Sequence, residues 1–161
     1  PKRKLPLVST LFTYDEDQKN IFLELICERV VETKKQALKI NLHPVNVNCK
    51  SILIVGGGDE FKMKIFIELV SILLESKSVY IFYKSHPVFN FDNLFFNYKG
   101  NDKFKIIEDK RFFPAVDYLF HDNSTLAYEY LSCSNKVQCF NVNDYLDFDD
   151  YLDMLVDKIN E

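Results

Sequence analysis

The chain has 161 residues, of which 47% are hydrophobic and 27% are charged, and this composition is typical of a folded globular protein with one sizeable core. Its 20 Lys and Arg residues against 24 Asp and Glu residues give a net charge of −4, which argues against general nucleic-acid binding through phosphate neutralisation. Fifteen Phe and nine Tyr residues, with only four Gly and five Pro, argue against disordered and low-complexity classes.

Apolar, β-prone runs alternate with longer segments of helical periodicity along the chain. The predicted strands are Leu7–Phe12, Ala37–Leu42, Ser51–Val55, Val79–Tyr83, Phe104–Ile107, Asp117–Phe120 and Val137–Asn141. The predicted helices are Asp17–Thr33, Glu60–Glu75, Ser124–Ser132 and Phe148–Asn160, and the aromatic segment Asn90–Asp102 is expected to be a loop or a short helix. Because most strands are continuously apolar, both faces of the sheet should be covered. The pattern predicts an α/β fold: a Rossmann-like three-layer sandwich with a mainly parallel sheet.

Two segments share one pattern. Residues 7–44 and 52–87 each read as strand, helix and strand, followed by His-Pro. The similarity is either a duplication or the ordinary regularity of doubly wound proteins. We expect an N-terminal βαβ unit over residues 1–48, lying on the same sheet or serving as an interdomain segment, and a Rossmann-like domain over residues 49–161.

The sequence carries only a weak signal for a membrane-spanning segment. The longest apolar stretch, residues 65–74, is about half the roughly 20 residues of a membrane span and contains Glu68. We expect no transmembrane segment and a cytoplasmic protein, which could be peripheral at the inner membrane face. The start at Pro1 without Met suggests a processed chain or a piece of a longer one.

The four cysteines form no Cys-x-x-Cys pair and have no His at zinc-finger spacing. We therefore expect reduced, mostly buried thiols at Cys27, Cys49, Cys133 and Cys139 and no metal site. The aspartates between Asp144 and Asp157 lack the spacing of a calcium loop, and they are expected to favour the N-terminus of the last helix.

In an open α/β sheet, ligands bind outside the carboxyl ends of the strands, and the first such junction is Gly56-Gly57-Gly58-Asp59. Glycines there let backbone N–H groups approach a ligand closely, at a helix N-terminus that attracts anions. A tight strand-to-helix turn capped by Asp59 explains the same residues without a ligand.

The second junction is Lys84-Ser85-His86-Pro87. Residues two apart on a strand face the same side, so the Lys84 ammonium and the His86 imidazole would suit a phosphate or a sugar hydroxyl. A strand-ending histidine that is held by the backbone is the alternative.

The third junction is Asp122-Asn123-Ser124-Thr125, where a strand runs straight into a helix. The hydroxyls and free N–H groups of the first helical turn could clamp a phosphate. A Ser or Asn would also cap the helix in any protein, and neither interpretation excludes the other.

Together these junctions outline a nucleotide-phosphate site, and residues 51–161 resemble the nucleotide-binding C-terminal domain of GT-B glycosyltransferases. The pattern is most similar to bacterial surface-polysaccharide enzymes that carry Lys-x-His-Pro and then Asp-x-Ser-Ser or Asp-x-Ser-Thr. These enzymes include teichoic-acid glycerophosphotransferases and several sialyl- and Kdo-transferases.

The resemblance implies that the chain is half of a GT-B architecture. It assigns the phosphate and ribose of the donor to His86, Ser124 and Thr125. The three junctions add further predicted nucleotide- or phosphate-binding residues: Gly56, Gly57, Gly58, Lys84 and Asn123. His86 would also be catalytic, because its positive charge, with that of Lys84 and the helix termini, would stabilise the leaving phosphate without a metal. No cofactor is implied beyond the nucleotide-sugar substrate.

The function expected from the resemblance is donor binding in a glycosyltransferase or polyol-phosphate transferase of bacterial-type surface polysaccharide synthesis. The donor would be a CMP- or CDP-linked sugar, with a UDP-linked sugar as an alternative. A glycan or lipid-linked acceptor would need an N-terminal domain that 161 residues do not accommodate, so the isolated chain could be inactive.

Two other functions are compatible with the sequence. One is an enzyme similar to UDP-sugar 2-epimerases, in which paired acidic and histidine residues do acid/base work. The other is a non-enzymatic, Rossmann-like interaction module that uses the aromatic segment Phe89–Tyr98 as a partner surface.

Overall fold

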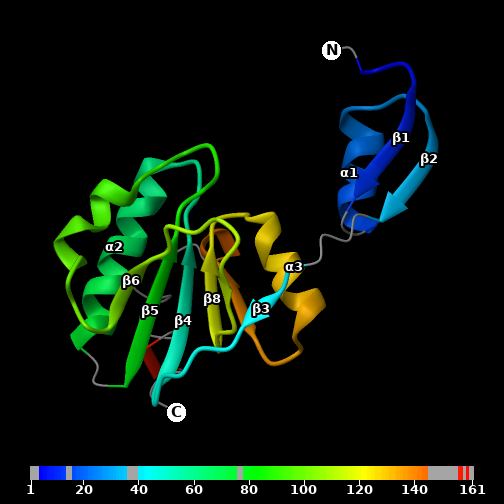
Figure 1. The fold of residues 1–161 in the computed structure, drawn as a ribbon. Coiled ribbons are helices and arrows are strands. Elements are labelled where there is room, and N and C mark those ends of the chain that lie inside the picture. The colour runs from blue at the N-terminus through cyan, green and yellow to red at the C-terminus, as the bar shows by residue number, and fades with distance from the viewer. Residues whose placement is uncertain are drawn as a thin grey trace. The chain divides into compact units, whose positions relative to one another are not determined.

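The computed structural model describes residues 4–13, 16–35, 40–75, 78–144, 156–157 and 159. By its internal contacts the chain divides into two units, residues 1–39 and residues 40–161, which Figure 1 shows in blue and in cyan to red. The first unit contains one parallel strand pair, and the second contains a five-stranded sheet.

The first unit consists of β1 (Val8–Thr13), α1 (Glu16–Leu25) and β2 (Val30–Lys35). The two strands pair in parallel, from Val8 opposite Val30 onward. The predicted helix Asp17–Thr33 was therefore too long, because α1 ends at Leu25 and residues 30–33 belong to β2. The β-branched residues of β2 favour an extended backbone, and pairing with β1 supplies its hydrogen bonds.

The second unit is built on β4 (Lys50–Val55), β5 (Val79–Lys84), β6 (Phe104–Ile106), β8 (Tyr118–His121) and β9 (Gln138–Asn141). These strands are ordered β6-β5-β4-β8-β9, and every pairing is parallel (Figure 1). The predicted α/β fold with a mainly parallel, Rossmann-like sheet is confirmed.

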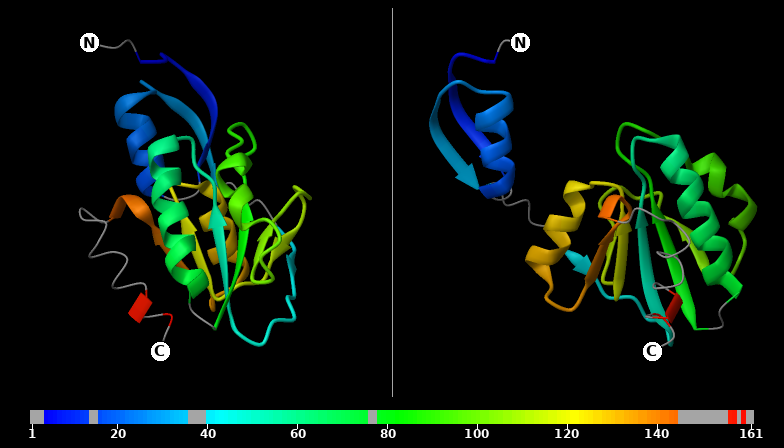
Figure 2. Two further views of the ribbon diagram at one scale, coloured as in Figure 1. Left: turned by 90° about the vertical axis from the view of Figure 1, so that its left-hand side faces the viewer. Right: turned by 180° about the vertical axis from the view of Figure 1, so that it is seen from behind.

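Both faces of this sheet are covered. On β4, Ile52 and Ile54 belong to the core cluster that includes the buried side of α2 (Glu60–Glu75). Leu53 and Val55 alternate with them and pack in the cluster that includes α3 (Thr125–Cys133). The 3₁₀ helix η1 (Asp92–Tyr98) lies beside α2 and away from α3 (Figure 2). Continuously apolar strands therefore follow from coverage on both faces, as the sequence predicted.

The short elements were harder to predict. The segment Asn90–Asp102 contains η1, as the loop-or-short-helix prediction allowed. Of the predicted strand Ala37–Leu42, residues 37–39 lie outside the described residues, and of the remaining three only Leu42 belongs to a strand. It begins β3 (Leu42–His43), which pairs in parallel with β7 (Phe113–Pro114). A two-residue strand that contains proline carries too little periodicity to be found in a sequence.

The C-terminal part is described only in places. A short 3₁₀ helix, η2 (Val142–Asp144), follows β9. The predicted helix Phe148–Asn160 lies mostly outside the described residues, but residues 156, 157 and 159 are helical. None of the described helices is both long enough and apolar enough to cross a membrane.

The strand order determines where a ligand can bind. From β4 the chain moves outward to β5 and β6, and then returns to the other side of β4 as β8. The loops after β4 and β8 therefore leave the sheet toward opposite faces, and they open a crevice between them at the carboxyl edge.

Candidate functional site

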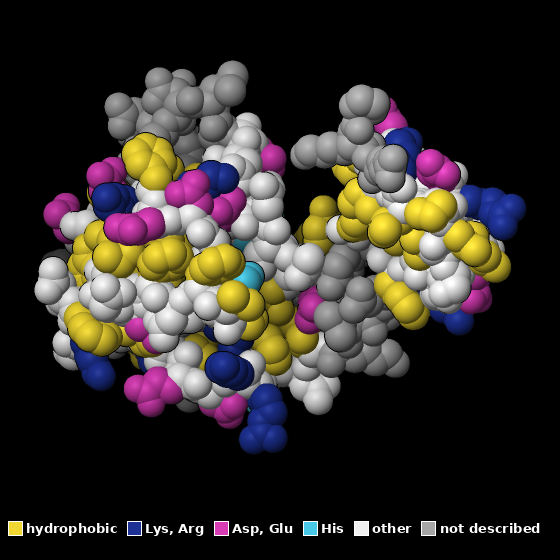
Figure 3. All heavy atoms as spheres, turned by 90° about the horizontal axis from the view of Figure 1, so that it is seen from above, with side chains coloured by type: hydrophobic (Ala, Val, Ile, Leu, Met, Phe, Trp, Pro, Cys, Tyr) yellow, Lys and Arg dark blue, Asp and Glu magenta, His cyan; other side chains and the backbone are white. Residues whose placement is uncertain are grey.

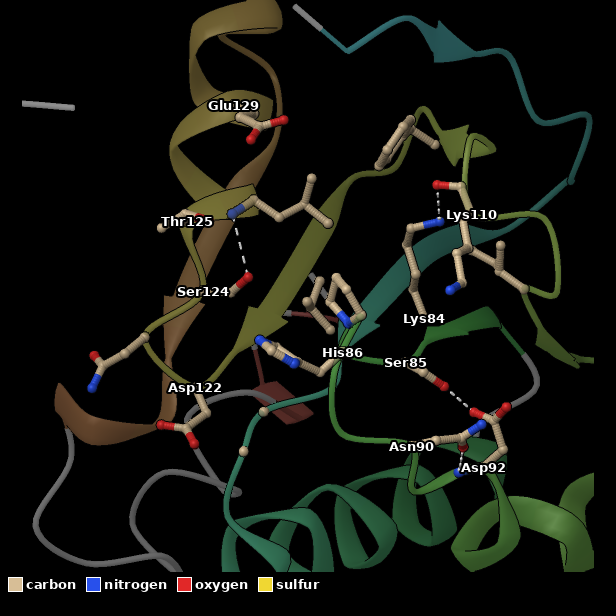
Figure 4. A pocket seen from close by; sticks show the side chains of 18 of the residues that line it. Lys84, Ser85, His86, Asn90, Asp92, Lys110, Asp122, Ser124, Thr125 and Glu129 are labelled. Carbon is tan, nitrogen blue, oxygen red and sulfur yellow. Dashed lines mark hydrogen bonds between the residues drawn. The ribbon is translucent and has the colours of Figure 1, made fainter. Parts of the chain in front are cut away.

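A cavity of about 740 Å³ lies at this carboxyl edge. Its walls come from the residues that follow β4, β5, β6 and β8, and Figure 4 shows the side chains that line it. Figure 3, which looks down on this edge, shows hydrophobic side chains gathered around a histidine. The cavity is therefore at the place where the strand order predicts a ligand crevice.

Nearly all of the predicted site residues line this one cavity: Gly57, Gly58, Lys84, His86, Asn123, Ser124 and Thr125. Gly56 is absent from the lining. It lies behind the cavity wall, where its N–H donates to the Lys84 carbonyl at 2.8 Å. The three sequence junctions are thus brought together by the sheet.

The glycine turn is shaped by close approach. A Cβ added at Gly56 would lie 3.0 Å from the His86 backbone nitrogen, and one added at Gly57 would lie 2.6 Å from Oδ2 of Asp122. At Gly58 the neighbour is the Phe89 ring, 3.1 Å away. The turn therefore needs small residues because neighbouring groups occupy the space that a Cβ would fill.

The same turn starts α2. Asp59 Oδ1 accepts the Phe61 N–H at 2.8 Å, which is the helix cap that the sequence allowed. The structural interpretation of this junction is therefore confirmed, and the ligand-binding interpretation stays a prediction.

Lys84 is nearly buried, and its ammonium is fully engaged by backbone. Nζ donates to the carbonyls of Asp109 (3.2 Å), Lys110 (2.9 Å) and Phe112 (3.1 Å), and lies 4.6 Å from the centroid of the Phe113 ring. Burial lowers the Lys84 pKa, and the charge of Asp109 opposes this effect. Since an ammonium has three hydrogens, Lys84 orders the 108–113 loop and contributes charge to the cavity wall rather than a free donor.

His86 is anchored through one ring nitrogen. Nδ1 accepts the N–H groups of Val88 (3.1 Å) and Phe89 (3.3 Å), and the imidazole packs on the Phe89 ring with centroids 5.2 Å apart. The neutral ring therefore carries its proton on Nε2, which can donate to a ligand. In Figure 4 the imidazole extends from the end of β5 toward the turn at Asp122 and Ser124.

The N-terminus of α3 faces the cavity. Ser124 is the N-cap, and its Oγ accepts the Leu126 N–H at 3.3 Å, so the predicted cap is present. The Ser124 hydroxyl hydrogen is still available to a ligand. Within the described residues, the Thr125 N–H and hydroxyl form no hydrogen bond. These donors stand where the helix dipole attracts negative charge.

An amide and ion-pair network fixes the turn before α3. Asn123 has a φ of +46°, and its N–H donates to Asn141 Oδ1 at 3.2 Å while its own Oδ1 accepts from Asn141 Nδ2 at 2.8 Å. Asp122 Oδ1 accepts from Lys62 Nζ (2.9 Å) and Asn143 Nδ2 (2.6 Å). The exposed Asn123 side chain therefore shapes the turn through its pairing with Asn141.

Glu129 lines the cavity, although the sequence analysis did not single it out. It lies one helical turn after Thr125 (Figure 4), and the residue is only 8% exposed. Among the described residues its carboxylate has no hydrogen-bond or ion-pair partner, and burial raises its pKa. The available signal was the i, i+4 spacing from Thr125, which places both side chains on one helix face.

The thiols and metal ligands complete the chemical survey. Cys27 is buried, Cys49 and Cys139 are half-buried, and Cys133 at the end of α3 is exposed. The expectation of mostly buried thiols was therefore wrong, because the terminal turn of α3 leaves Cys133 at the surface. Among the residues that the structure describes, no cluster of His, Cys, Asp and Glu could hold a metal ion.

Chemically, the cavity is divided between donors and apolar walls. The Gly58 N–H, the His86 Nε2–H and the first turn of α3 suit an anion such as a phosphate. Apolar side chains of Ile107, Phe113 and Leu126 line another part of the same cavity and suit a ring or an alkyl group.

Comparison of this chain with protein-family models, with characterised proteins and with solved structures gives no match. The function of the cavity is therefore argued from its own residues.

Proposed function

We propose that this chain binds the nucleotide part of a nucleotide-activated sugar and is the donor-binding domain of a glycosyltransferase or polyol-phosphate transferase. The supporting observation is that His86, Ser124 and Thr125 line one cavity at the N-terminus of α3, where the strand order reverses. These are the residues that the Lys-x-His-Pro and Asp-x-Ser-Thr motifs assign to the donor phosphate.

The phosphate would lie against the first turn of α3. Thr125 offers its N–H and its hydroxyl, Gly58 offers a backbone N–H, and His86 offers Nε2–H. Donors that are fixed in place before the ligand arrives bind an anion without a reorganisation cost. The ammonium of Lys84 would add favourable charge from the cavity wall.

The nucleoside would extend toward the apolar part of the cavity. Ile107, Phe113 and Leu126 would contact the base, and the unpartnered Glu129 carboxylate would accept hydrogen bonds from sugar hydroxyls. The choice of cytosine over uracil rests on the resemblance of the motifs.

Transfer from such a donor breaks the bond between the transferred group and the nucleotide, whose phosphate gains negative charge as it leaves. The His86 Nε2–H and the α3 N-terminus would stabilise that developing charge. A glycan or lipid-linked acceptor would be held by a further domain, on the cytoplasmic side of a membrane, and would complete the reaction.

A second candidate is an enzyme similar to UDP-sugar 2-epimerases. Glu129 favours it, because a buried carboxyl with a raised pKa beside a histidine-lined cavity is suited to acid/base work. This candidate predicts a preference for uridine nucleotides.

The interaction-module alternative is less favoured by the packing. In the segment Phe89–Tyr98, Phe95 is fully buried, and Phe91 and Tyr98 pack against the core. Only part of this aromatic segment is left for a partner, with Phe89 and Phe96 exposed.

The test is calorimetric titration of the chain with CMP, UMP and inorganic phosphate, repeated on His86→Ala and on the double variant Ser124→Ala/Thr125→Ala. His43→Ala is a matched control, because His43 also precedes a proline but is exposed and does not line the cavity. We expect CMP affinity to fall at least about tenfold in the two site variants and to stay unchanged in the control. A preference for UMP would favour the second candidate, and no binding of any probe by the folded chain would overturn the proposal.

A further inference from the structure

A second histidine, which is buried, supports the turn before α3 from outside the cavity lining. His121 is the last residue of β8 and is only 8% exposed. Its Nδ1 accepts the Ser124 N–H at 3.2 Å, which closes the Asp122-Asn123 turn immediately before α3. His86 directs Nε2–H toward a ligand, whereas His121 is absent from the cavity lining and contacts the backbone that carries the donors.

We propose that His121 is a positioning residue: its neutral imidazole holds the Ser124 amide and thereby directs the Thr125 N–H and hydroxyl into the cavity, so that protonation of His121 weakens phosphate binding. This inference rests on the proposed function, because it concerns the same anion site.

The geometry makes the turn depend on this bond. Asn123 has a φ of +46°, a conformation that is costly for a residue other than glycine unless its surroundings enforce it. Asn141 holds one side of the turn through the Asn123 N–H, and His121 holds the other side through the Ser124 N–H. Thr125 directly follows the residue that His121 fixes.

Protonation would reverse the role of Nδ1. A neutral imidazole accepts a hydrogen bond at Nδ1, whereas an imidazolium donates from both nitrogens. An Nδ1–H would then face the Ser124 N–H, and two donors in contact repel each other. The ring or the turn must move, and the donors of Thr125 move with the turn.

The surroundings of His121 favour the neutral ring. Burial is the largest effect and lowers its pKa, while the charges of Asp144 in η2 and Asp122 in the turn oppose it. Its register partners on β4 and β9 are the uncharged Val55 and Asn141. The first residues of α3 are uncharged, and Lys62 on α2 is paired to Asp122.

The expected pH dependence has a distinctive sign. A histidine that contacts an anion directly binds it more tightly as the pH falls, because the ring becomes cationic. A histidine that must accept an N–H predicts weaker binding at low pH. The direction of the change therefore separates a positioning role from a ligand role.

The test compares wild type with His121→Asn, which keeps an acceptor but does not titrate, and with His121→Ala, which has none. CMP affinity is measured by calorimetry between pH 8 and pH 5. Wild type and His121→Asn are titrated with the same ligand, so the titration of the CMP phosphate cancels in the ratio of their affinities. At pH 8 we expect His121→Asn to remain close to wild type and His121→Ala to lose about tenfold or more, as for other positioning partners.

As the pH falls, wild type should lose affinity relative to His121→Asn. A constant ratio, or a gain by wild type, would overturn the inference. A folded wild type that does not bind CMP at pH 8 would overturn the proposed function and this pH-dependent binding with it.

A nuclear magnetic resonance measurement needs no ligand. It therefore separates failure of the positioning role from failure of the proposed function. The chain has three histidines, so the ring nitrogens can be assigned with single variants. At pH 8 the His121 ring should show an unprotonated Nδ1 and a protonated Nε2, and the Ser124 amide signal should titrate with His121. A protonated Nδ1 at pH 8 would contradict the positioning role whether or not CMP binds.

Discussion

Two strand-to-helix turns meet in the cavity, and they obtain their shapes in opposite ways. The turn of residues 56–59, after β4, has no side chain on its first three residues, and neighbouring groups occupy the space that a Cβ would fill. The turn of residues 122–124, after β8, is held by hydrogen bonds that involve side chains. The Asn123 and Ser124 N–H groups donate to the side chains of Asn141 and His121, and the Asn141 amide donates to the Asn123 side chain. Each turn has a side chain that caps the following helix, Asp59 in one and Ser124 in the other.

The difference predicts how each turn fails. Added atoms should disrupt the glycine turn, and removed hydrogen bonds should disrupt the polar turn. The two also interlock, since the Asp122 carboxylate lies against Gly57. Their mutual position, which sets the distance between the Gly58 and Thr125 donors, therefore depends on both mechanisms.

The largest effect is expected from Gly57→Ala. The new methyl would lie 2.6 Å from Asp122 Oδ2, and Asp122 cannot move away without breaking its bonds to Lys62 and Asn143. We expect the free energy of unfolding to fall by about 2 kcal/mol in urea titrations.

Gly58→Ala is the control, because its contact is the exposed Phe89 ring, which can shift. A change near zero is expected there, as reduced chain entropy offsets the closer contact. Equal losses in both variants would contradict the role assigned to Asp122.

Removal of the two helix caps should separate stability from binding. Ser124→Ala and Asp59→Ala each delete one cap hydrogen bond, and each should lower the free energy of unfolding by about 1 kcal/mol. Only Ser124 lines the cavity, so only its variant should weaken CMP binding in calorimetry. Equal binding losses in both would show that the effect comes from instability alone.

Glu129→Gln should stabilise the fold. Burial raises the Glu129 pKa, so the folded state binds a proton more readily than the unfolded state, and ionisation near neutral pH costs stability. We expect a gain of up to about 1 kcal/mol at pH 7, which shrinks as the pH falls through the raised folded-state pKa and is lost once the pH reaches the unfolded-state pKa of the carboxyl. A loss of stability at pH 7 would indicate that the carboxylate has a stabilising partner.

His121 should cause the smallest and most pH-dependent effect on stability. Burial lowers its pKa in the folded state, so the unfolded state binds more protons, and stability falls as the pH drops below the unfolded pKa of about 6.5. Urea titrations from pH 8 to pH 5 should show a steeper decline in wild type than in His121→Asn. Parallel curves would show that His121 does not titrate differently on folding.

The sequence predicted the sheet and the cavity because both depend on strong local signals. Apolar strand runs such as Ser51–Val55, and the motifs at strand ends, can be recognised without knowing how the strands pair. Parallel pairing alone then brings the carboxyl ends of the strands together. The helix over Asp17–Thr33 was extended too far because helical periodicity continued past Leu25, where strand pairing overrides it.

The side-chain roles could not be predicted in this way. Lys84 points to three carbonyls of a loop more than 20 residues away, a contact that no local pattern encodes. The support that His121 gives to Ser124 is local, but the unusual φ of Asn123 that brings them together depends on Asn141 across the sheet. Glu129 could be identified as a candidate only from the structure, because its burial results from packing.

The most direct test of a phosphate site at the two turns is a CMP titration followed by ¹H–¹⁵N correlation spectra of the intact chain. The amide signals of Gly58 and Thr125 should shift together and saturate with one dissociation constant, while those of the first unit, such as Leu11, stay in place. Saturable shifts that leave both amides unchanged, or no shift in a folded chain, would contradict the assignment of this cavity as a nucleotide site.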